Sequence, residues 1–223
     1  MNPLHVDLAV ETKMLVLIGG GEFSFGETRS IDEFLVARMP AGRRTIAFLP
    51  TASGSAEYAS HLGKYFQQID PAVETINVPI YRGRDGRRQK SLSQLLAAGM
   101  IYLGGGVTNN LLATLFDSPA DLAMRDAAAS GAVVAAIGAA ASCFGVHARD
   151  MRGTGALKGL GWLAGTVVDT GFDPSDDETL RRLMSYPDVR IGIGIPAGAA
   201  IAISADGTAE VLGSGSVAVF RKG

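Results

Sequence analysis

The stretch GAVVAAIGAAASCFG, from Gly131 to Gly145, decides the fold of this chain. Its apolar, β-branched beginning is typical of a buried parallel strand, and the small residues after Ile137 predict a sharp turn into an alanine-rich helix. Hydrolases often present a reactive Ser or Cys at such a turn, which we call the elbow, with backbone N–H groups directed at the oxyanion. The centre of this elbow is Gly138, which has no side chain. The fold signal is present here, and the nucleophile is absent.

Apolar segments alternate with amphipathic ones on both sides of this stretch, which predicts strands alternating with helices. We expect strands at 14–18, 45–49, 73–79, 100–103 and 133–137 and helices at 31–38, 56–69, 92–98, 110–115 and 120–130. Beyond the elbow, we expect a loop and strand within 159–172, a helix at 178–184 and β-segments at 190–195, 199–203, 209–212 and 217–220. The pattern predicts an α/β fold, a three-layer sandwich with a mostly parallel sheet, helices on both faces and a β-rich C-terminal extension.

Length and composition favour a single domain. The chain has 223 residues, and 47% of them are hydrophobic, which is enough for a sizeable core. We expect one domain over 13–223, preceded by a mobile arm over 1–12. The arm carries acidic residues and lacks the apolar core of a secretion signal, and no isolated run of about 18 uncharged apolar residues follows it. The sequence therefore predicts a cytoplasmic protein that does not contact a membrane.

The charged and metal-ligating residues argue against several kinds of function. The net charge of −2 does not provide the basic field with which nucleic-acid binders attract phosphates. The histidines, His5, His61 and His147, lack the spacing of metal ligands, and the lone Cys143 rules out an internal disulfide. We expect no bound metal, no cofactor and no nucleic acid. The segment Arg82 to Lys90 is interpreted as a solvated surface loop, with a site for an acidic partner as the alternative.

Several motifs occur in an order that carries a family resemblance. They are LIGGGE at 17–22, FLPTAS at 48–53, YLGGGVTNNLL at 102–112, the elbow, GLGWLAGTVVDTGF at 159–172, GIGIPAG at 192–198 and VLGSGSVAVF at 211–220. Together they resemble the serine peptidase family that contains aspartyl dipeptidase (peptidase E) and cyanophycinase, over nearly the whole chain. The resemblance implies a fold related to class I glutamine amidotransferases and hydrolysis by a serine nucleophile. It also implies a homodimer.

The residues that catalyse in that family are replaced in this chain. The family's elbow reads G-T-S-A-G-A, and an alignment without gaps places its serine on Gly138. The family's V-D-x-H-F segment corresponds to VDTGF here, so that Asp169 is kept and the histidine position is Gly171. A further acidic pair of many members corresponds to Pro196 and Ala197. The resemblance implies that nucleophile and general base are both lost, and losing either one typically costs about a million-fold in turnover.

Backbone groups of the site can remain in place when these side chains are replaced. By the resemblance, Gly105, Gly106 and the N–H of Ala139 correspond to the oxyanion frame. Thr108 and Asn109 then border the pocket. We name these five residues as candidate ligand-binding residues. The alternative is that they form a tight turn that packs against the elbow.

Cys143 and Ser142 are the alternative nucleophiles. The segment around Cys143 resembles the small-x-Cys-x-Gly elbow of glutamine amidotransferases, and His147 would share its helical face if Cys143 were already inside the helix. Free cysteines are commonly buried, so core packing is our preferred interpretation of Cys143. Ser142 is the weaker candidate because its second neighbour is the bulky Phe144.

These observations favour a catalytically degenerate relative of the serine peptidases that retains a pocket for a peptide-like or amino-acid-derived ligand. An active peptidase or amide hydrolase with a rebuilt site, using Cys143 or Ser142, is the first alternative. A regulatory subunit that pairs with an active homologue is the second.

Overall fold

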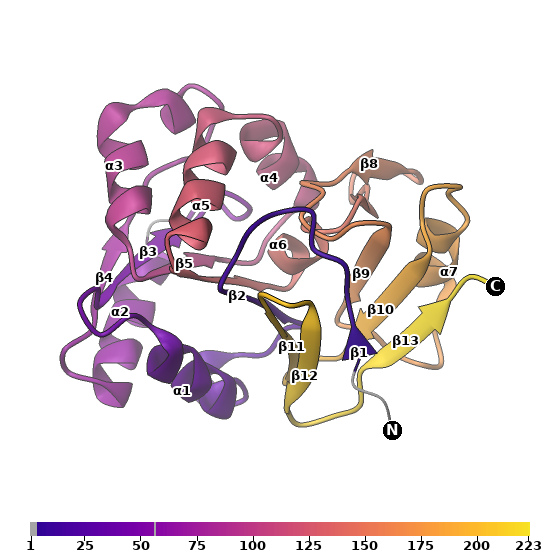
Figure 1. The fold of residues 1–223 in the computed structure, drawn as a ribbon, viewed down its shortest axis with the longest axis horizontal. Coiled ribbons are helices and arrows are strands. Elements are labelled where there is room, and N and C mark those ends of the chain that lie inside the picture. Colours follow the sequence, from indigo (N-terminus) through magenta and orange to yellow (C-terminus); the bar gives the residue numbers. More distant parts are fainter. Residues whose placement is uncertain (1–3, 56) are drawn as a thin grey trace.

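A mostly parallel sheet lies between two layers of helices (Figure 1). The computed structural model describes residues 4–55 and 57–223; Ala56, where the sequence predicts the second helix to begin, lies outside them. Within the described residues the main sheet has eight strands in the order β1-β12-β11-β2-β6-β5-β3-β4. The strands from β2 to β4 in this order pair in parallel, whereas β11, β12 and β1 pair antiparallel. The predicted three-layer α/β fold is confirmed.

The strand and helix bounds follow the predicted ranges closely. The main sheet contains β1 (Leu4–His5), β2 (Met14–Ile18), β3 (Thr45–Leu49), β4 (Glu74–Asn77), β5 (Met100–Leu103), β6 (Val133–Ile137), β11 (Ala199–Ser204) and β12 (Thr208–Gly213). The helices are α1 (Arg29–Arg38), α2 (Glu57–Ile69), α3 (Gln89–Ala97), α4 (Thr108–Leu115), α5 (Pro119–Ala129), α6 (Ala139–Ser142) and α7 (Glu178–Met184), with 3-10 turns η1 (Phe23–Phe25) and η2 (Asp85–Arg87). Smaller sheets contain β9 (Thr166–Thr170), β10 (Ile191–Ile195) and β13 (Ala218–Arg221), and the hairpin β7 (His147–Arg149) and β8 (Ala156–Lys158). None of the described helices has the length and apolar character needed to cross a membrane.

The alternation of side chains along the strands builds two cores, one on each face of the main sheet. Leu15 and Leu17 of β2 belong to the core that α3, α4 and α5 cover, whereas Val16 and Ile18 belong to the core that α1 and α2 cover. Successive residues of a strand point to opposite faces, so both sets of side chains must be apolar. This is why the central strands are uninterrupted apolar runs, and every residue of β2 and β6 is buried.

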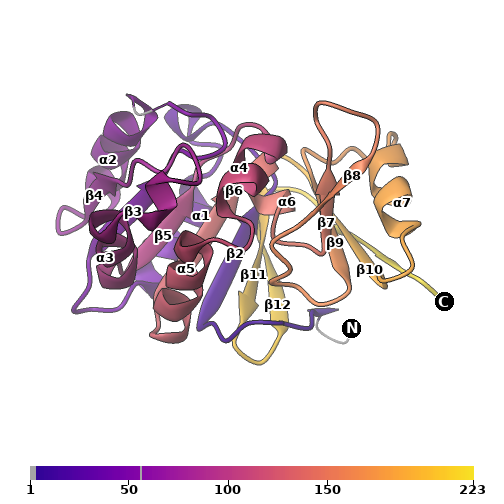
Figure 2. The same cartoon turned by 90° about the horizontal axis from the view of Figure 1, so that it is seen from above.

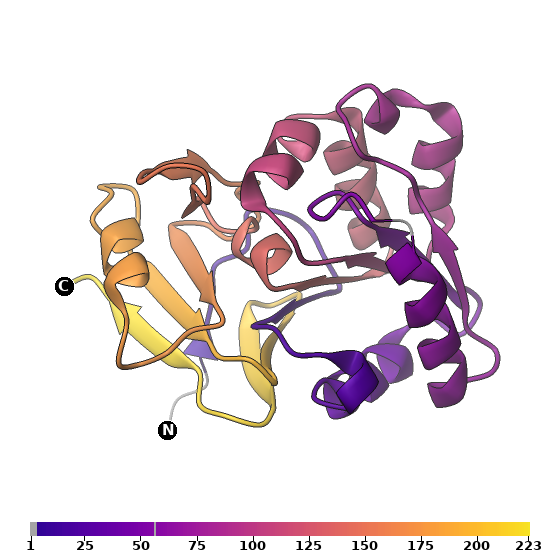
Figure 3. The ribbon, with the colours of Figure 1, turned by 180° about the vertical axis from the view of Figure 1, so that it is seen from behind.

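The C-terminal β-segments divide between two sheets. β11 and β12 join the main sheet as an antiparallel hairpin beside β2, whereas β10 and β13 form a small sheet with β9. Figures 2 and 3 show this small sheet and α7 beside the main sheet, next to β11 and β12. The chain changes sheets after β10, where Pro196 cannot donate a further ladder hydrogen bond and Gly198 turns with a φ of 73°.

The described part of the N-terminal arm is held against the rest of the chain, in contrast to the mobile arm that the sequence predicts. Leu4 and His5 pair with β12, and Val6 is completely buried. The N–H of Ala9 donates to the carbonyl of Trp162 over 2.8 Å. Sequence pattern does not reveal such an edge pairing, because the partner strand lies near the other end of the chain. The first three residues of the arm lie outside the described part.

The elbow is followed by a single helical turn, shorter than the alanine-rich helix that the sequence predicts. The backbone N–H of Cys143 donates to the carbonyl of Ala140, and the carbonyl of Cys143 accepts from Leu160 N–H over 2.7 Å. Gly145 then passes so close to β9 that an added Cβ would lie 2.7 Å from the carbonyl oxygen of Thr166. The long-range contacts with the 159–172 segment therefore end α6 despite its favourable alanine content.

Asp32 on α1 is a completely buried carboxyl group. Its Oδ2 accepts hydrogen bonds from Thr28 Oγ1 at 2.7 Å and from the Tyr65 hydroxyl at 2.8 Å, and its Oδ1 has no partner among the described residues. Burial raises the pKa of Asp32 to about 6, although the two hydrogen bonds oppose the rise. Because this value exceeds the unfolded pKa of about 3.9, the fold favours the protonated carboxyl. That stabilisation is complete below about pH 4 and is lost as the pH rises through about 6.

The substitution Asp32→Asn keeps the shape of the side chain and removes its titration. As the pH rises from about 4 to about 7, the free energy of unfolding of the wild type should fall relative to that of Asp32→Asn by about 3 kcal/mol at most. Urea unfolding of both proteins across this pH range measures the difference. A difference that does not change with pH would contradict a raised pKa at Asp32.

Candidate functional site

Four segments that follow parallel strands meet at one edge of the main sheet and surround a cavity of about 380 Å³, which we call the glycine cavity. They are 19–21 after β2, 50–55 after β3, 104–106 after β5 and Gly138 after β6. The carboxyl ends of parallel strands share one edge, and open α/β sheets bind their ligands there. The lining residues are Gly20, Gly21, Phe48, Ser53, Ser55, Tyr58, Gly104, Gly105, Ile137 and Gly138.

Gly138 has the backbone of a nucleophile elbow. It joins β6 to α6 with φ of 57° and ψ of −130°, a conformation that side-chain-bearing residues adopt only under strain. A Cβ placed on it would meet no atom within 4 Å. Its N–H donates to the carbonyl of Ile18 at the end of β2, over 2.9 Å. The elbow therefore has the shape and the space for a nucleophile, and it has glycine in that place.

Gly171 lies beside Gly138 at the end of β2. Its N–H donates to the carbonyl of Gly19 over 2.7 Å. Gly19 directly follows Ile18, whose carbonyl accepts the hydrogen bond from Gly138. Gly171 has a φ of 63°, and a Cβ on it would also meet no atom within 4 Å. The preceding carboxylate of Asp169 is half-buried; burial raises its pKa, and the positive charge of Arg149 opposes the rise. The structure thus brings together the two positions at which the sequence predicts lost catalytic side chains.

Unused hydrogen-bond donors surround the elbow. Among the hydrogen bonds of the described residues, the backbone N–H groups of Gly105, Gly106 and Ala139 have no acceptor. Ala139 is the first residue of α6, and N–H groups at a helix start are free to bind a ligand oxygen. Gly106, with φ of 152°, approaches the 52–53 backbone so closely that a Cβ would lie 2.4 Å from the carbonyl carbon of Ala52. Glycine is required there for packing as well as for the donor geometry.

Thr108 and Asn109 do not line the glycine cavity, and their side chains hold a neighbouring loop. Thr108 Oγ1 donates to the carbonyl of Arg149 at 2.6 Å. Asn109 Nδ2 donates to Asp150 Oδ1 at 2.7 Å, and its Oδ1 accepts from the N–H of Met151 at 3.0 Å. The hydrogen bond from Asn109 is the main reason why the pKa of Asp150 is lowered. These contacts fix the loop after β7 to the start of α4; contact of Thr108 and Asn109 with a ligand stays a prediction.

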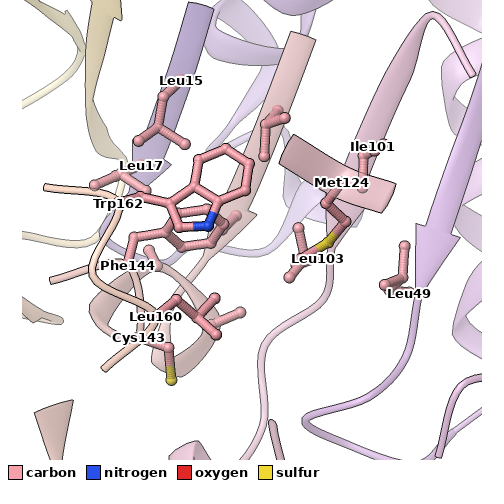
Figure 4. Packing of buried hydrophobic residues seen from close by; sticks show 14 of the residues in the cluster. Leu15, Leu17, Leu49, Ile101, Leu103, Met124, Cys143, Phe144, Leu160 and Trp162 are labelled. Carbon is pink, nitrogen blue, oxygen red and sulfur yellow. The ribbon is translucent and has the colours of Figure 1, made fainter. Parts of the chain in front are cut away.

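Cys143 is completely buried in the core beside α6. Figure 4 shows it within the cluster that contains Leu160 and Trp162. Its Sγ donates to the carbonyl of Ala139 at 3.2 Å, and the Ser142 hydroxyl donates to the same carbonyl at 2.9 Å. Burial raises the pKa of the Cys143 thiol far above its ordinary value, so that the thiolate does not form near neutral pH. A nucleophilic role for Cys143 therefore conflicts with its surroundings.

His147 does not pair with Cys143, because α6 ends before it and His147 begins β7. Its Nε2 lies 2.8 Å from Asp188 Oδ1, and its ring stacks on Tyr186 with 4.4 Å between centroids. These residues line a second cavity of about 770 Å³, with Arg125 and others. This cavity is larger than the glycine cavity, but its wall does not include the elbow. Four of its polar side chains pair with each other, His147 with Asp188 and Arg125 with Asp121.

The arginine-rich segment folds around the buried carboxylate of Asp85. That carboxylate accepts hydrogen bonds from the N–H groups of Tyr81 and Arg82, and its other oxygen lies 3.0 Å from Arg88 Nη2. The arginine side chains of the segment are exposed, as expected of a surface loop, and none of them lines the glycine cavity. Within the described residues, no three side chains of His, Cys, Asp or Glu gather as metal ligands.

Tyr58, Ser53 and Ser55 line the glycine cavity and are not among the residues that the sequence predicts for the site. Burial, with the nearby negative charges of Glu22 and Asp32, raises the pKa of Tyr58 to about 12, so its hydroxyl stays protonated. The signal that could have found Ser53 is the motif FLPTAS at 48–53, which begins in the last two residues of β3 and continues past its end, where the chain must reach the same sheet edge. Tyr58 comes from α2 and has no comparable sequence signal.

The fold and the elbow define an α/β protein of the kind that hydrolases with a nucleophile elbow share. Comparison with known proteins identifies the family: the pattern of Peptidase family S51 matches residues 15–211. The chain therefore belongs to Peptidase family S51, as the sequence resemblance predicts.

Relatives and solved structures agree with this assignment. The "Uncharacterized peptidase YgaJ" of Bacillus subtilis (strain 168) is 32% identical over 179 residues, which cover 78% of this chain and 73% of that protein. The "Cyanophycinase" of Trichormus variabilis is 28% identical over 224 residues, covering 93% of this chain and 74% of the relative. A crystal structure of a peptidase from an acI-B1 Actinobacterium has the same fold, with a TM-score of 0.78 and 23% identity over 94% of this chain and 91% of that one. A putative peptidase E of Listeria monocytogenes EGD-e matches with a TM-score of 0.61 and 16% identity, over 95% of this chain and all of that one.

The burial of Cys143 predicts that the folded protein resists thiol reagents. Because this is the only cysteine of the chain, labelling with iodoacetamide followed by mass spectrometry reports on it alone. At about pH 8 the folded protein should react at least about a hundredfold more slowly than the protein unfolded in guanidinium. Labelling of the folded protein at the rate of the unfolded one would show that Cys143 is accessible. That result would favour the hypothesis that Cys143 is the nucleophile.

The close approach at Gly106 predicts that this position tolerates no side chain. Gly106→Ala should lower the free energy of unfolding by about 2 kcal/mol or more, because the methyl group meets the Ala52 backbone and φ is positive. The matched control is Gly83→Ala, where an added Cβ meets no atom within 4 Å and which should change stability by about 0.5 kcal/mol at most. Urea unfolding measures both, and equal effects of the two substitutions would contradict the packing of the 104–106 turn.

Proposed function

We propose that this S51 family member is catalytically degenerate and binds a peptide-like or amino-acid-derived ligand in the glycine cavity. The observation that carries the proposal is Gly138, which has an elbow backbone and open space for a side chain. Hydrolysis through an acyl-enzyme requires a nucleophile at such a point, and glycine has no atom that can attack a carbonyl.

The second replacement strengthens the argument, because the Gly171 N–H donates to the carbonyl of Gly19, which directly follows the Ile18 that binds Gly138. In a serine triad, removing the nucleophile or its histidine costs about a million-fold in turnover. The oxyanion donors that remain supply only about 10³ to 10⁴ over the reaction in water. A chain without both side chains retains groups that bind a carbonyl oxygen and lacks groups that transfer an acyl group or a proton.

The hydroxyls near the elbow do not replace the lost pair. Ser53 and Ser55 line the glycine cavity, but none of its lining residues is a histidine, so these hydroxyls lack the base that activates a serine. The Ser142 hydroxyl donates a hydrogen bond to the Ala139 carbonyl, and Cys143 is buried. The rebuilt active site is therefore the less favoured alternative.

The free N–H groups define what the cavity can hold. Gly105 lines the cavity, and Gly106 and Ala139 directly follow the lining residues Gly105 and Gly138 in the chain. A carbonyl or carboxylate oxygen that reaches these N–H groups would gain hydrogen bonds that the fold leaves unmade. A volume of about 380 Å³ lies at the small end of the range for small-molecule sites, which suits one or two amino-acid units. Homodimerisation, a cytoplasmic location and pairing with an active homologue stay predictions from the sequence.

Assays of hydrolysis test the degeneracy directly. The wild type should not cleave aspartyl dipeptides or amino-acid p-nitroanilides above the buffer rate. Gly138→Ser combined with Gly171→His should exceed the Gly138→Ser single variant by at least about a hundredfold, because both positions have room and histidine tolerates a positive φ better than most residues. The serine should lower the free energy of unfolding by about 1 to 3 kcal/mol through backbone strain.

Three outcomes separate the alternatives. Hydrolysis by the wild type that disappears in Cys143→Ala or Ser142→Ala would overturn the proposal in favour of a rebuilt site. Hydrolysis that survives both substitutions would overturn it in favour of an unrecognised mechanism. A folded double variant with no gain would show that Gly138 and Gly171 do not occupy the catalytic positions.

A further inference from the structure

We propose that the glycine cavity selects a ligand with an uncharged apolar or aromatic side chain and rejects one with an acidic side chain. The inference rests on the proposed binding function and adds the chemical class of the ligand. It is carried by the lining of the cavity, which contains glycines, hydroxyl-bearing residues and apolar side chains.

The lining contains no ionisable group of the kind that recognises an acid. None of its described residues is Arg, Lys, His, Asp or Glu, and its polar side chains are the hydroxyls of Ser53, Ser55 and Tyr58. A buried carboxylate needs a cation or several hydrogen bonds to compensate the loss of its water shell. The backbone N–H groups near the elbow can supply such bonds at one point, and the proposed ligand uses them for its carbonyl oxygen.

Apolar side chains line the same cavity. This apolar wall consists of Phe48, Tyr58 and Ile137, and the rings of Phe48 and Tyr58 lie 5.6 Å apart between centroids with an interplanar angle of 32°. Phe48 also lies against Gly104, where a Cβ would come within 2.7 Å of its ring. Offset aromatic rings with centroids at this distance attract each other and a further aromatic ring placed beside them. The wall therefore favours a phenyl or branched aliphatic group.

Two acidic groups act on Tyr58 of this wall. Glu22 and Asp32 both raise the pKa of Tyr58 by their charge, and no cation lowers it. Glu22 directly follows the lining glycine Gly21, and its carboxylate accepts hydrogen bonds from Ser24. An aspartyl or glutamyl side chain in the cavity would meet repulsion from these groups and no opposing charge.

Binding of four blocked amino acids tests the selection. The probes are the N-acetyl amides of phenylalanine, leucine, asparagine and aspartate, titrated into ¹⁵N-labelled wild-type protein and followed by the backbone amide signals of Gly105 and Ala139. The phenylalanine and leucine probes should bind at least about tenfold more tightly than the aspartate probe. The asparagine probe, which has the shape of aspartate without its charge, should lie between them.

A substitution at one exposed lining residue should reduce the discrimination. Ser55 lines the cavity with an exposed side chain, so Ser55→Arg places a cation there without disturbing the core. Affinity for the aspartate probe should rise at least about fivefold, while that for the phenylalanine probe should change by less than about twofold. The matched control is Ser60→Arg, an equally exposed position on α2 outside the lining, which should change neither affinity.

The outcomes distinguish this inference from the function on which it depends. Equal or tighter binding of the aspartate probe to the wild type, with shifts at Gly105 and Ala139, overturns the selection and leaves the binding function standing. An equal gain for aspartate in Ser55→Arg and Ser60→Arg overturns the assignment of the selection to this cavity. If no probe shifts either amide signal, both the selection and the proposed binding function fail.

Discussion

Strand β6 is hydrogen-bonded in parallel to β2 on one side and to β5 on the other, and the site depends on this double pairing. Pairing in parallel brings the carboxyl ends of the three strands to one edge, where β2 and β5 continue into three glycines each and β6 continues into Gly138. The ladder extends one residue beyond β6, because the N–H of Gly138 donates to the carbonyl of Ile18. The elbow is thus held by the sheet itself, and its shape does not require a catalytic side chain.

Glycine at the elbow changes the energetics of the turn as well as its chemistry. A serine or cysteine with the φ and ψ of Gly138 would carry backbone strain of about 1 to 3 kcal/mol, which enzymes tolerate for the sake of catalysis. Glycine adopts the same conformation with little strain. The two glycines at the lost catalytic positions, Gly138 and Gly171, are both in open space with positive φ, whereas Gly104 and Gly106 are required by close packing. The packing glycines would persist without any function, so the argument for binding depends on the free N–H groups and the cavity.

The glycine cavity and the cavity beside His147 show why volume alone does not identify a site. The lining of the larger one includes polar side chains that pair with each other, such as His147 with Asp188. The smaller one, at the elbow, has apolar walls, hydroxyl groups and backbone donors without acceptors. A ligand in the glycine cavity can form hydrogen bonds with donors that have no partner. In the larger cavity a ligand would first have to separate side chains that already pair with one another.

The amino-acid sequence by itself determined the order and type of nearly all the longer elements and the absence of a side chain at Gly138. It could do so because continuous apolar runs and glycine-rich strand exits are local patterns. Only the tertiary structure decided that the C-terminal strands divide between two sheets, that β1 joins β12 and that α6 stops after one turn. It also decided that Cys143 is buried, that Asn109 holds Asp150, and that Tyr58 from α2 walls the cavity. The reason is that these outcomes depend on contacts between residues far apart in the chain, and such contacts leave no periodic pattern in the sequence around either partner.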